Sequence, residues 1–148
     1  MVGLNVAVLP IDLNAPATKW WPARVIVLTQ ACDLAQAKVE SVLVSRVHNA
    51  QTLVETGVLK GTVIRDHMRR HLVFGWYFLP AATTPVSLPE SLVDLRDVHS
   101  VPRVALEQLI KSGKRVASLA SPYREHLAQH FAVTYMRVAL PEPYATQV

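Results

Sequence analysis

The run Val25-Ile26-Val27-Leu28 is the feature that most constrains the fold of this chain. Four consecutive apolar residues, three of them β-branched, are typical of a strand that is buried on both faces. The polar turn Thr29-Gln30-Ala31-Cys32-Asp33 follows, and Asp33 can cap a short helix over residues 34–40. We therefore expect residues 24–33 to organise the domain, and we expect this turn to be the first candidate for a functional site.

The composition supports a folded domain around such a strand. The chain has 148 residues, of which 51% are apolar and 18% are charged, which is enough for the core of one domain and untypical of disorder. No apolar run approaches the ~20 residues that cross a bilayer, so we expect no membrane partner. We also expect no signal peptide, and the single cysteine favours the reducing cytoplasm.

The order of strand and helix patterns predicts the fold class. Alternating or continuous apolar patterns predict strands at 2–9, 24–28, 41–47, 71–79 and 92–98, with Gly75 as a bulge. Shorter strands are predicted at 53–54 and 62–64, and residues 10–22, which include Trp20 and Trp21, are predicted to form a loop.

The last third of the chain has a helical pattern. Ser100 and Pro102 mark the start of one helix, which ends at Gly113, and Ser121-Pro122 marks the start of another, which stops before Pro141. We expect a single α+β domain over residues 1–148, with 1–99 mainly β, 100–141 helical and 142–148 a tail. Its predicted architecture is a small, strongly bent, mostly antiparallel sheet or an SH3-like barrel, followed by two C-terminal helices.

The polar turn after the central strand offers one candidate nucleophile and three candidate ligand contacts. Cys32 lies just before a predicted helix N-terminus, which favours a thiolate, although an isolated cysteine is more often a small buried side chain. Thr29, Gln30 and Asp33 could bind a ligand at the strand end. Equally, they could satisfy backbone groups where the sheet stops.

Two pairs of histidines are spaced four residues apart. His67 and His71 fall in a segment predicted to be a strand, where the two rings would stand too far apart to share a metal ion. His126 and His130 fall one turn apart on the last predicted helix, where a solvated or partly buried helix face is the ordinary explanation. We therefore expect no metal site, and no other cofactor.

A basic cluster beside aromatic residues points to single-stranded nucleic acid as a partner. The net charge is +4, and single-stranded nucleic acid is bound by basic grooves with stacking aromatic rings. The chain has no P-loop, GxGxxG or GxSxG motif, which disfavours nucleotide-driven chemistry. The residues predicted to bind nucleic acid are Lys60, Arg65, Arg69, Arg70 and Trp76.

Residues 22–47, PARVIVLTQACDLAQAKVESVLVSRV, resemble the core of the MazF/PemK-type toxin barrels. This resemblance implies an SH3-like barrel, homodimerisation and metal-independent cleavage of single-stranded RNA. The chain departs from the family pattern where the catalytic residues belong. Trp21 takes the place of the arginine before the proline, Arg24 lies inside the strand, and Val47 and His48 take the place of the family's Ser/Thr.

Taken together, these features predict a non-catalytic binding or interaction module of a bacterial nucleic-acid-related or stress/defence system. One alternative is a small endoribonuclease that uses Arg24, His48 and the basic cluster. A second alternative is a cysteine hydrolase centred on Cys32. A protein partner or a second copy of the chain could also cover the last helix, if Tyr123, Phe131 and Tyr135 exceed what the sheet can bury.

Overall fold

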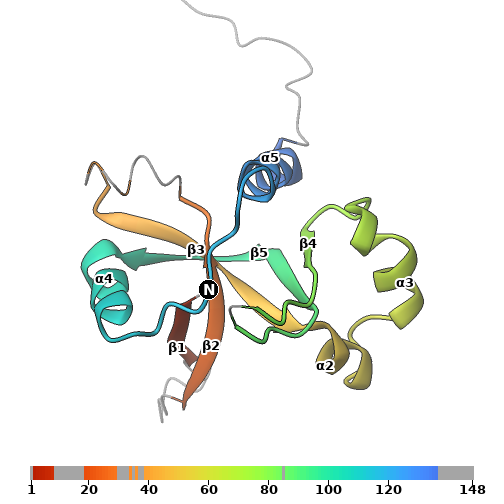
Figure 1. The fold of residues 1–148 in the computed structure, drawn as a ribbon, viewed down its shortest axis with the longest axis horizontal. Helices are drawn as coiled ribbons and strands as arrows, with labels where there is room; N and C mark the ends of the chain where they lie inside the picture. The colour runs from red at the N-terminus through yellow and green to blue at the C-terminus, as the bar shows by residue number, and fades with distance from the viewer. Residues whose placement is uncertain are drawn as a thin grey trace, which may run out of the picture.

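An antiparallel sheet of five strands forms the centre of the molecule (Figure 1). This computed structural model describes residues 2–8, 19–29, 34, 36, 39–84 and 86–136. The strands are β1 (Val2–Val8), β2 (Lys19–Val27), β3 (Ser41–Asn49), β4 (Trp76–Leu79) and β5 (Ser91–Pro102), in the spatial order β1-β2-β3-β5-β4. The prediction of an α+β domain with a mostly antiparallel sheet is confirmed. The alternative of a closed barrel is wrong, because β1 and β4 do not pair and remain the two edges of the described sheet.

Helices cover both faces of this sheet. They are α2 (Ala50–Glu55), α3 (Gly61–Asp66), the 3₁₀ helix η1 (Met68–Arg70), α4 (Arg103–Lys111) and α5 (Tyr123–Tyr135). On one face, α4 covers one end while α2, α3 and η1 cover the other, and α5 packs on the opposite face. None of the helices described here has the length and apolar character needed to cross a membrane.

The central strand is buried on both faces, as its apolar run predicts. Val25 is 1% exposed and packs in one cluster with Val44 and Leu106 of α4. Its neighbour Ile26 is 8% exposed and packs on the other face in a cluster that contains Leu127 of α5. Successive side chains of a strand point to opposite faces, so the two neighbours tie the helices of both layers to one strand.

The segment predicted as two short strands at 53–54 and 62–64 is helical instead. Asn49 caps α2, because its side-chain oxygen accepts hydrogen bonds from the amides of Gln51 (2.8 Å) and Thr52 (3.3 Å). Three apolar residues of this segment then pack against Trp76, Phe78 and Leu92 of the sheet; they are Leu53, Ile64 and Met68. Tertiary packing thus outweighs the strand propensity of the β-branched residues here.

The bounds of β2 and β4 differ most at their N-terminal ends from the predicted strands. Only the last four residues of the predicted strand 71–79 are extended, because His71 and Gly75 adopt positive φ angles of 55° and 82° in the preceding turn. Conversely, β2 begins at Lys19 rather than after Pro22. Pro22 fits there because its stretch of β2 pairs with β1 only, while pairing with β3 starts at Arg24.

The two helices predicted in the last third of the chain are confirmed as α4 and α5, but the predicted start at Ser100 is wrong, because β5 extends to Pro102 in pairing with β3 and α4 begins at Arg103. Leu127 is the buried apolar residue of α5, and Phe131 packs against the same cluster. Tyr135 remains more than half exposed, although its hydroxyl donates a hydrogen bond to the Leu95 carbonyl oxygen at 2.6 Å. The buried stripe of α5 is therefore shorter than the sequence spacing suggests.

Gly75 provides a test of the turn that sets the start of β4. A Cβ at Gly75 would lie 2.9 Å from Cδ of Arg96, whereas a Cβ at Gly113, which has a similar φ of 75°, would contact nothing within 4 Å. We expect Gly113→Ala to cost about 1 kcal/mol of unfolding free energy through the positive φ alone. Gly75→Ala should cost ~1–3 kcal/mol more, because the added methyl overpacks the turn.

Urea denaturation of both variants measures this difference. Placing Gly75→Ala in an Arg96→Ala background should remove the additional loss, since the clashing side chain is then absent. Equal losses for Gly75→Ala and Gly113→Ala would contradict the close approach of Arg96.

Candidate functional site

The polar turn that the sequence places first lies mostly outside the described residues. Gln30, Cys32 and Asp33 are not among them, so the roles of these three residues stay predictions. Thr29 is described, and its side-chain oxygen accepts a hydrogen bond from the Leu43 amide at 2.8 Å. The Leu28 amide donates to the Leu43 carbonyl oxygen beside it, so the Thr29 hydroxyl completes the β2–β3 ladder where the sheet ends.

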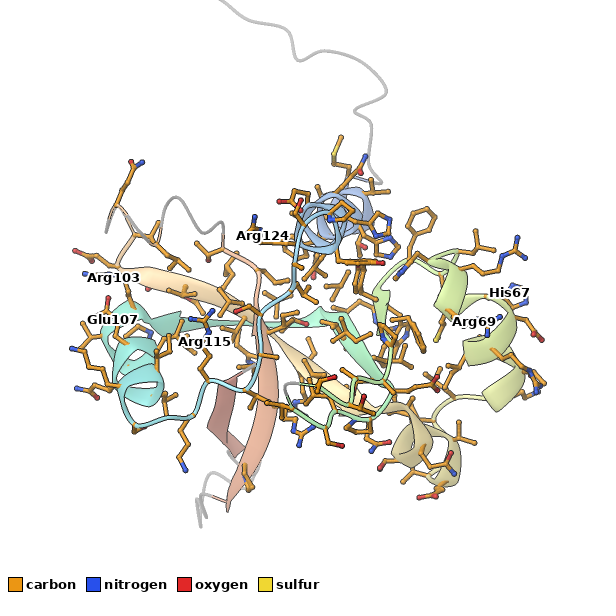
Figure 2. The ribbon with its side chains drawn as sticks, viewed as in Figure 1. His67, Arg69, Arg103, Glu107, Arg115 and Arg124 are labelled. Atoms are coloured by element: carbon orange, nitrogen blue, oxygen red, sulfur yellow. The ribbon has the colours of Figure 1, made fainter. Side chains whose placement is uncertain are left out.

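The predicted basic cluster forms an exposed surface on α3 and η1. We call this the basic surface, and its residues are Lys60, Arg65, Arg69 and Arg70, all of them exposed. Within the described part of the chain, Arg65 pairs with Asp66 at 3.6 Å, and the other three cations have no ion pair. Figure 2 shows Arg69 and His67 on this outer side of the molecule. Asp66 offsets one of the four positive charges, so the basic surface keeps a net positive charge.

Trp76, which the sequence analysis assigns to base stacking, is not part of that surface. It is 6% exposed and packs beneath α2, α3 and η1 with Met68 and Phe78. The guanidinium carbon of Arg96 lies 4.8 Å from the centre of its ring. A nucleic-acid base has no open face of this ring on which to stack.

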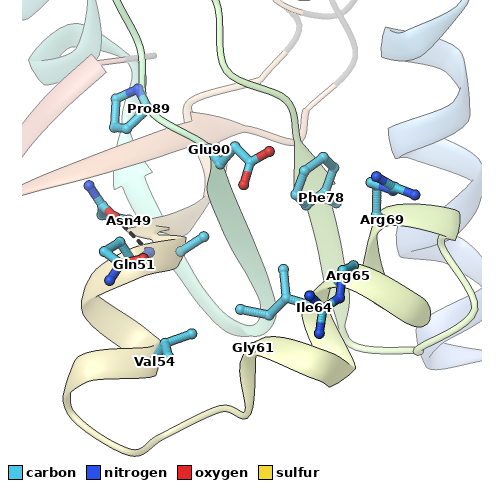
Figure 3. Close-up of a pocket in the computed structure, with 11 residues that line it drawn as sticks. Asn49, Gln51, Val54, Gly61, Ile64, Arg65, Arg69, Phe78, Pro89 and Glu90 are labelled. Carbon is cyan, nitrogen blue, oxygen red and sulfur yellow. Dashed lines mark hydrogen bonds between the residues drawn. The ribbon is translucent and has the colours of Figure 1, made fainter.

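A pocket of about 410 Å³ opens beside the basic surface (Figure 3). Its floor is apolar, and includes the buried residues Ala50, Ile64 and Phe78. Its polar lining residues come from β3, α2, α3, η1 and the segment before β5; they are Asn49, Gln51, Arg65, Arg69 and Glu90. An apolar floor with a few convergent polar groups is the usual form of a small-molecule or base pocket.

No family model, curated protein or solved structure matches this chain. The grounds for a function are therefore the side chains that the fold brings together.

A second pocket, of about 280 Å³, gathers the two residues of the predicted ribonuclease centre. It opens where β2 and β3 stop pairing, and Arg24, Arg46 and His48 line it. Arg46 is bound to Asp97 at 3.1 Å. Burial lowers the pKa of His48, and the Arg46 charge lowers it further, against the smaller opposing effects of Asp94 and Asp97. His48 is therefore neutral near pH 7 and able to accept a proton.

The structure also brings three histidines together, which the sequence does not predict. His71 in the turn after η1 lies beside His126 and His130 of α5, with ring centroids 4.8 and 5.9 Å away, and the two α5 rings are 6.2 Å apart. His67, the predicted neighbour of His71, is exposed and has no ring contact with them. No group of three His, Cys, Asp or Glu side chains in the described part of the chain has a geometry that could hold a metal ion.

Hydrogen bonds fix two of these rings on the sheet. His130 Nε2 donates to the Trp76 carbonyl oxygen at 3.1 Å. The Tyr77 hydroxyl donates to the Tyr123 carbonyl oxygen at 3.2 Å and lies 3.1 Å from His126 Nδ1. His71 Nδ1 is buried and has no hydrogen-bond partner among the described residues. Burial lowers the pKa of His71, and the proximity of the two α5 histidines lowers it further.

The histidine cluster predicts a pH-dependent stability. Because the pKa of His71 is below its usual value of 6.5 in the folded state, the unfolded chain binds the proton more tightly. The stabilisation is therefore complete above about pH 6.5 and is lost as the pH falls through the lowered pKa. Urea unfolding should show a lower free energy at about pH 5.5 than at about pH 7.5.

The variant His71→Asn should reduce this pH dependence, and asparagine tolerates the positive φ at that position. His67→Asn serves as the matched control, since it removes an exposed imidazole outside the cluster. The same pH dependence in both variants would contradict the assignment to His71.

Proposed function

We propose that this domain is a non-catalytic module that binds single-stranded nucleic acid through the basic surface and the adjacent pocket. The observation that carries this proposal is the position of unpaired, exposed cations beside an apolar-floored pocket. Lys60, Arg69 and Arg70 form no ion pair with described residues, and Arg65 and Arg69 both line the pocket. Cations of this kind bind phosphates, and a pocket next to them can receive a base.

In this proposal the floor of the pocket contacts the base, which is the role that the sequence analysis assigns to Trp76. The strand would follow α3 and η1 with its phosphates, while one base turns inward over Phe78 and Ile64 of the pocket floor. The place of the module in a bacterial stress or defence system rests on the resemblance of residues 22–47 to the toxin barrels, and is part of the proposal.

Salt-dependent binding tests the proposal. A labelled 12-nucleotide RNA without secondary structure should bind with an affinity that falls steeply with added salt. Arg69→Gln with Arg70→Gln removes two phosphate contacts, so the slope of log affinity against log salt should decrease in magnitude by about 1.4. Fluorescence anisotropy measures both quantities.

Lys111→Gln with Lys114→Gln is the matched control, because it removes the same charge from the opposite end of the sheet, at α4. This control should retain the wild-type slope. An equal reduction in both double variants would show that net charge alone, not the basic surface, controls binding.

A second candidate function is metal-independent cleavage of RNA, because the structure places Arg24 and His48 at one pocket. A neutral His48 can take the proton of a ribose 2′-hydroxyl. The 2′-oxygen then attacks the adjacent phosphorus, and the bond to the 5′-oxygen breaks as that oxygen gains a proton from water. Arg24 can stabilise the charge that develops on the phosphate oxygens.

Cleavage of single-stranded RNA in EDTA tests this candidate. Activity should fall by about 10²–10⁴-fold in His48→Gln, should be lost in Arg24→Ala, and should be absent on DNA of the same sequence. Arg115→Ala, which lies outside this pocket, is the control and should retain activity. Failure to cleave at high enzyme concentration would exclude the candidate and leave the binding proposal intact.

A further inference from the structure

We propose that the 410 Å³ pocket between α2 and α3 is a guanine site, which gives the module a preference for strands that contain G. This inference rests on the proposed function and names the base that the pocket selects. Three features carry it: the apolar floor, the carboxylate of Glu90, and the fixed orientation of Asn49.

The floor of the pocket is apolar. Phe78 and Ile64 line the pocket, and each is 7% exposed, so a small apolar area of each side chain faces a ligand. The volume of about 410 Å³ lies in the lower part of the usual ~300–1,000 Å³ range for ligand pockets, as expected for a single nucleotide. A base that lies on this floor directs its edge toward the polar rim.

Glu90 places a carboxylate on that rim. Its backbone carbonyl accepts the Ala50 amide at 2.9 Å, which ties the residue to the start of α2. Its side chain forms no hydrogen bond or ion pair with other described residues, and Figure 3 shows the carboxylate within the pocket, directed toward Phe78. The two carboxylate oxygens are therefore free to accept hydrogen bonds from a ligand.

Only guanine offers two neighbouring N–H donors on its Watson–Crick edge, at N1 and at the exocyclic N2. Adenine and cytosine each place an acceptor ring nitrogen beside their amino group, and uracil has one N–H between two carbonyl groups. A carboxylate therefore accepts two hydrogen bonds from guanine, while the other three bases bring at least one acceptor against it.

Asn49 and the arginines offer hydrogen-bond donors to the acceptor groups of guanine. The side-chain oxygen of Asn49 is engaged by the amides of Gln51 and Thr52, which leaves its NH₂ group as the available donor. Guanine carries acceptors at O6 and N7, so a rim of donors that includes Arg65 and Arg69 is complementary to the rest of the base and to its phosphate. A free phosphate or an acidic peptide would instead meet repulsion from Glu90.

The test uses U-rich 12-nucleotide RNAs that differ in one central base, which is G, inosine, A, C or U. At a fixed salt concentration, G should bind about tenfold more tightly than A, C or U, in line with one bidentate base contact. Inosine, which lacks the N2 amino group, should fall between them.

The variant Glu90→Gln should bring the affinity for the G strand close to that for the U strand, while the salt dependence of the U strand persists. Glu40→Gln removes the same charge at an exposed position outside the pocket lining, and should keep the preference for G. Circular dichroism of both variants establishes that they remain folded.

The outcomes separate this inference from the proposed function. Equal affinity for all five strands, with steep salt dependence, would overturn the guanine site and leave the nucleic-acid module standing. A preference for G that survives Glu90→Gln would overturn the role of the carboxylate. No binding to any strand would overturn both.

Discussion

The structure depends on the burial of its central strands on both faces. Val25 and Ile26 are adjacent in the chain, yet they belong to separate apolar clusters on opposite sides of the sheet. Burial of each such side chain contributes about 1.5–3 kcal/mol. An antiparallel sheet buried on both faces needs a helical layer on each side, which α2, α3, η1 and α4 provide on one face and α5 on the other.

The two helical groups on one face leave a polar strip between them. Val44 belongs to the cluster under α4, and Leu92 belongs to the cluster under α2, α3 and η1. Between these clusters the β3–β5 register shifts after Ser45, and Arg46 pairs with Asp97 across the strands. The irregular register thus separates the two apolar patches and places charged groups next to His48. The pocket of Arg24 and His48 lies at the end of this strip.

The parts of the fold that follow from local pattern could be predicted from the sequence. The apolar run at Val25 identifies the doubly buried strand, and the Ser-Pro and Gly signals identify α4 and α5. The region from 50 to 75 could not be predicted in this way, because Val54 and Ile64 have strand propensity and their helices depend on contacts with Trp76 and Phe78. The local signals for α2 are Asn49, which caps its start, and Gly57, which follows its end with a positive φ of 73°.

The candidate sites were predictable to the extent that their residues are neighbours in the sequence. The residues of the basic surface all lie in the continuous segment 60–70, so the sequence composition alone was sufficient to predict them. The 410 Å³ pocket and the histidine cluster could not be predicted, because Glu90 comes to the same pocket as Arg65, and His71 comes beside His126, only after the sheet has formed. The sequence analysis assigns Trp76 to base stacking because this aromatic residue follows the basic segment, but all four residues of β4 are buried, and the Trp76 ring is covered by α2, α3 and η1.

The contacts between α5 and the outermost strand bear on how copies of this chain can associate. His130 bonds to the carbonyl oxygen of Trp76, and the Gly75 amide donates to the Thr134 hydroxyl oxygen, so side chains of α5 occupy main-chain groups that an incoming strand would need. These contacts hinder further growth of the sheet at the start of β4. Fibrillar stacking is thereby disfavoured at β4, and a helix performs the protective role that charged or proline-rich edges perform elsewhere.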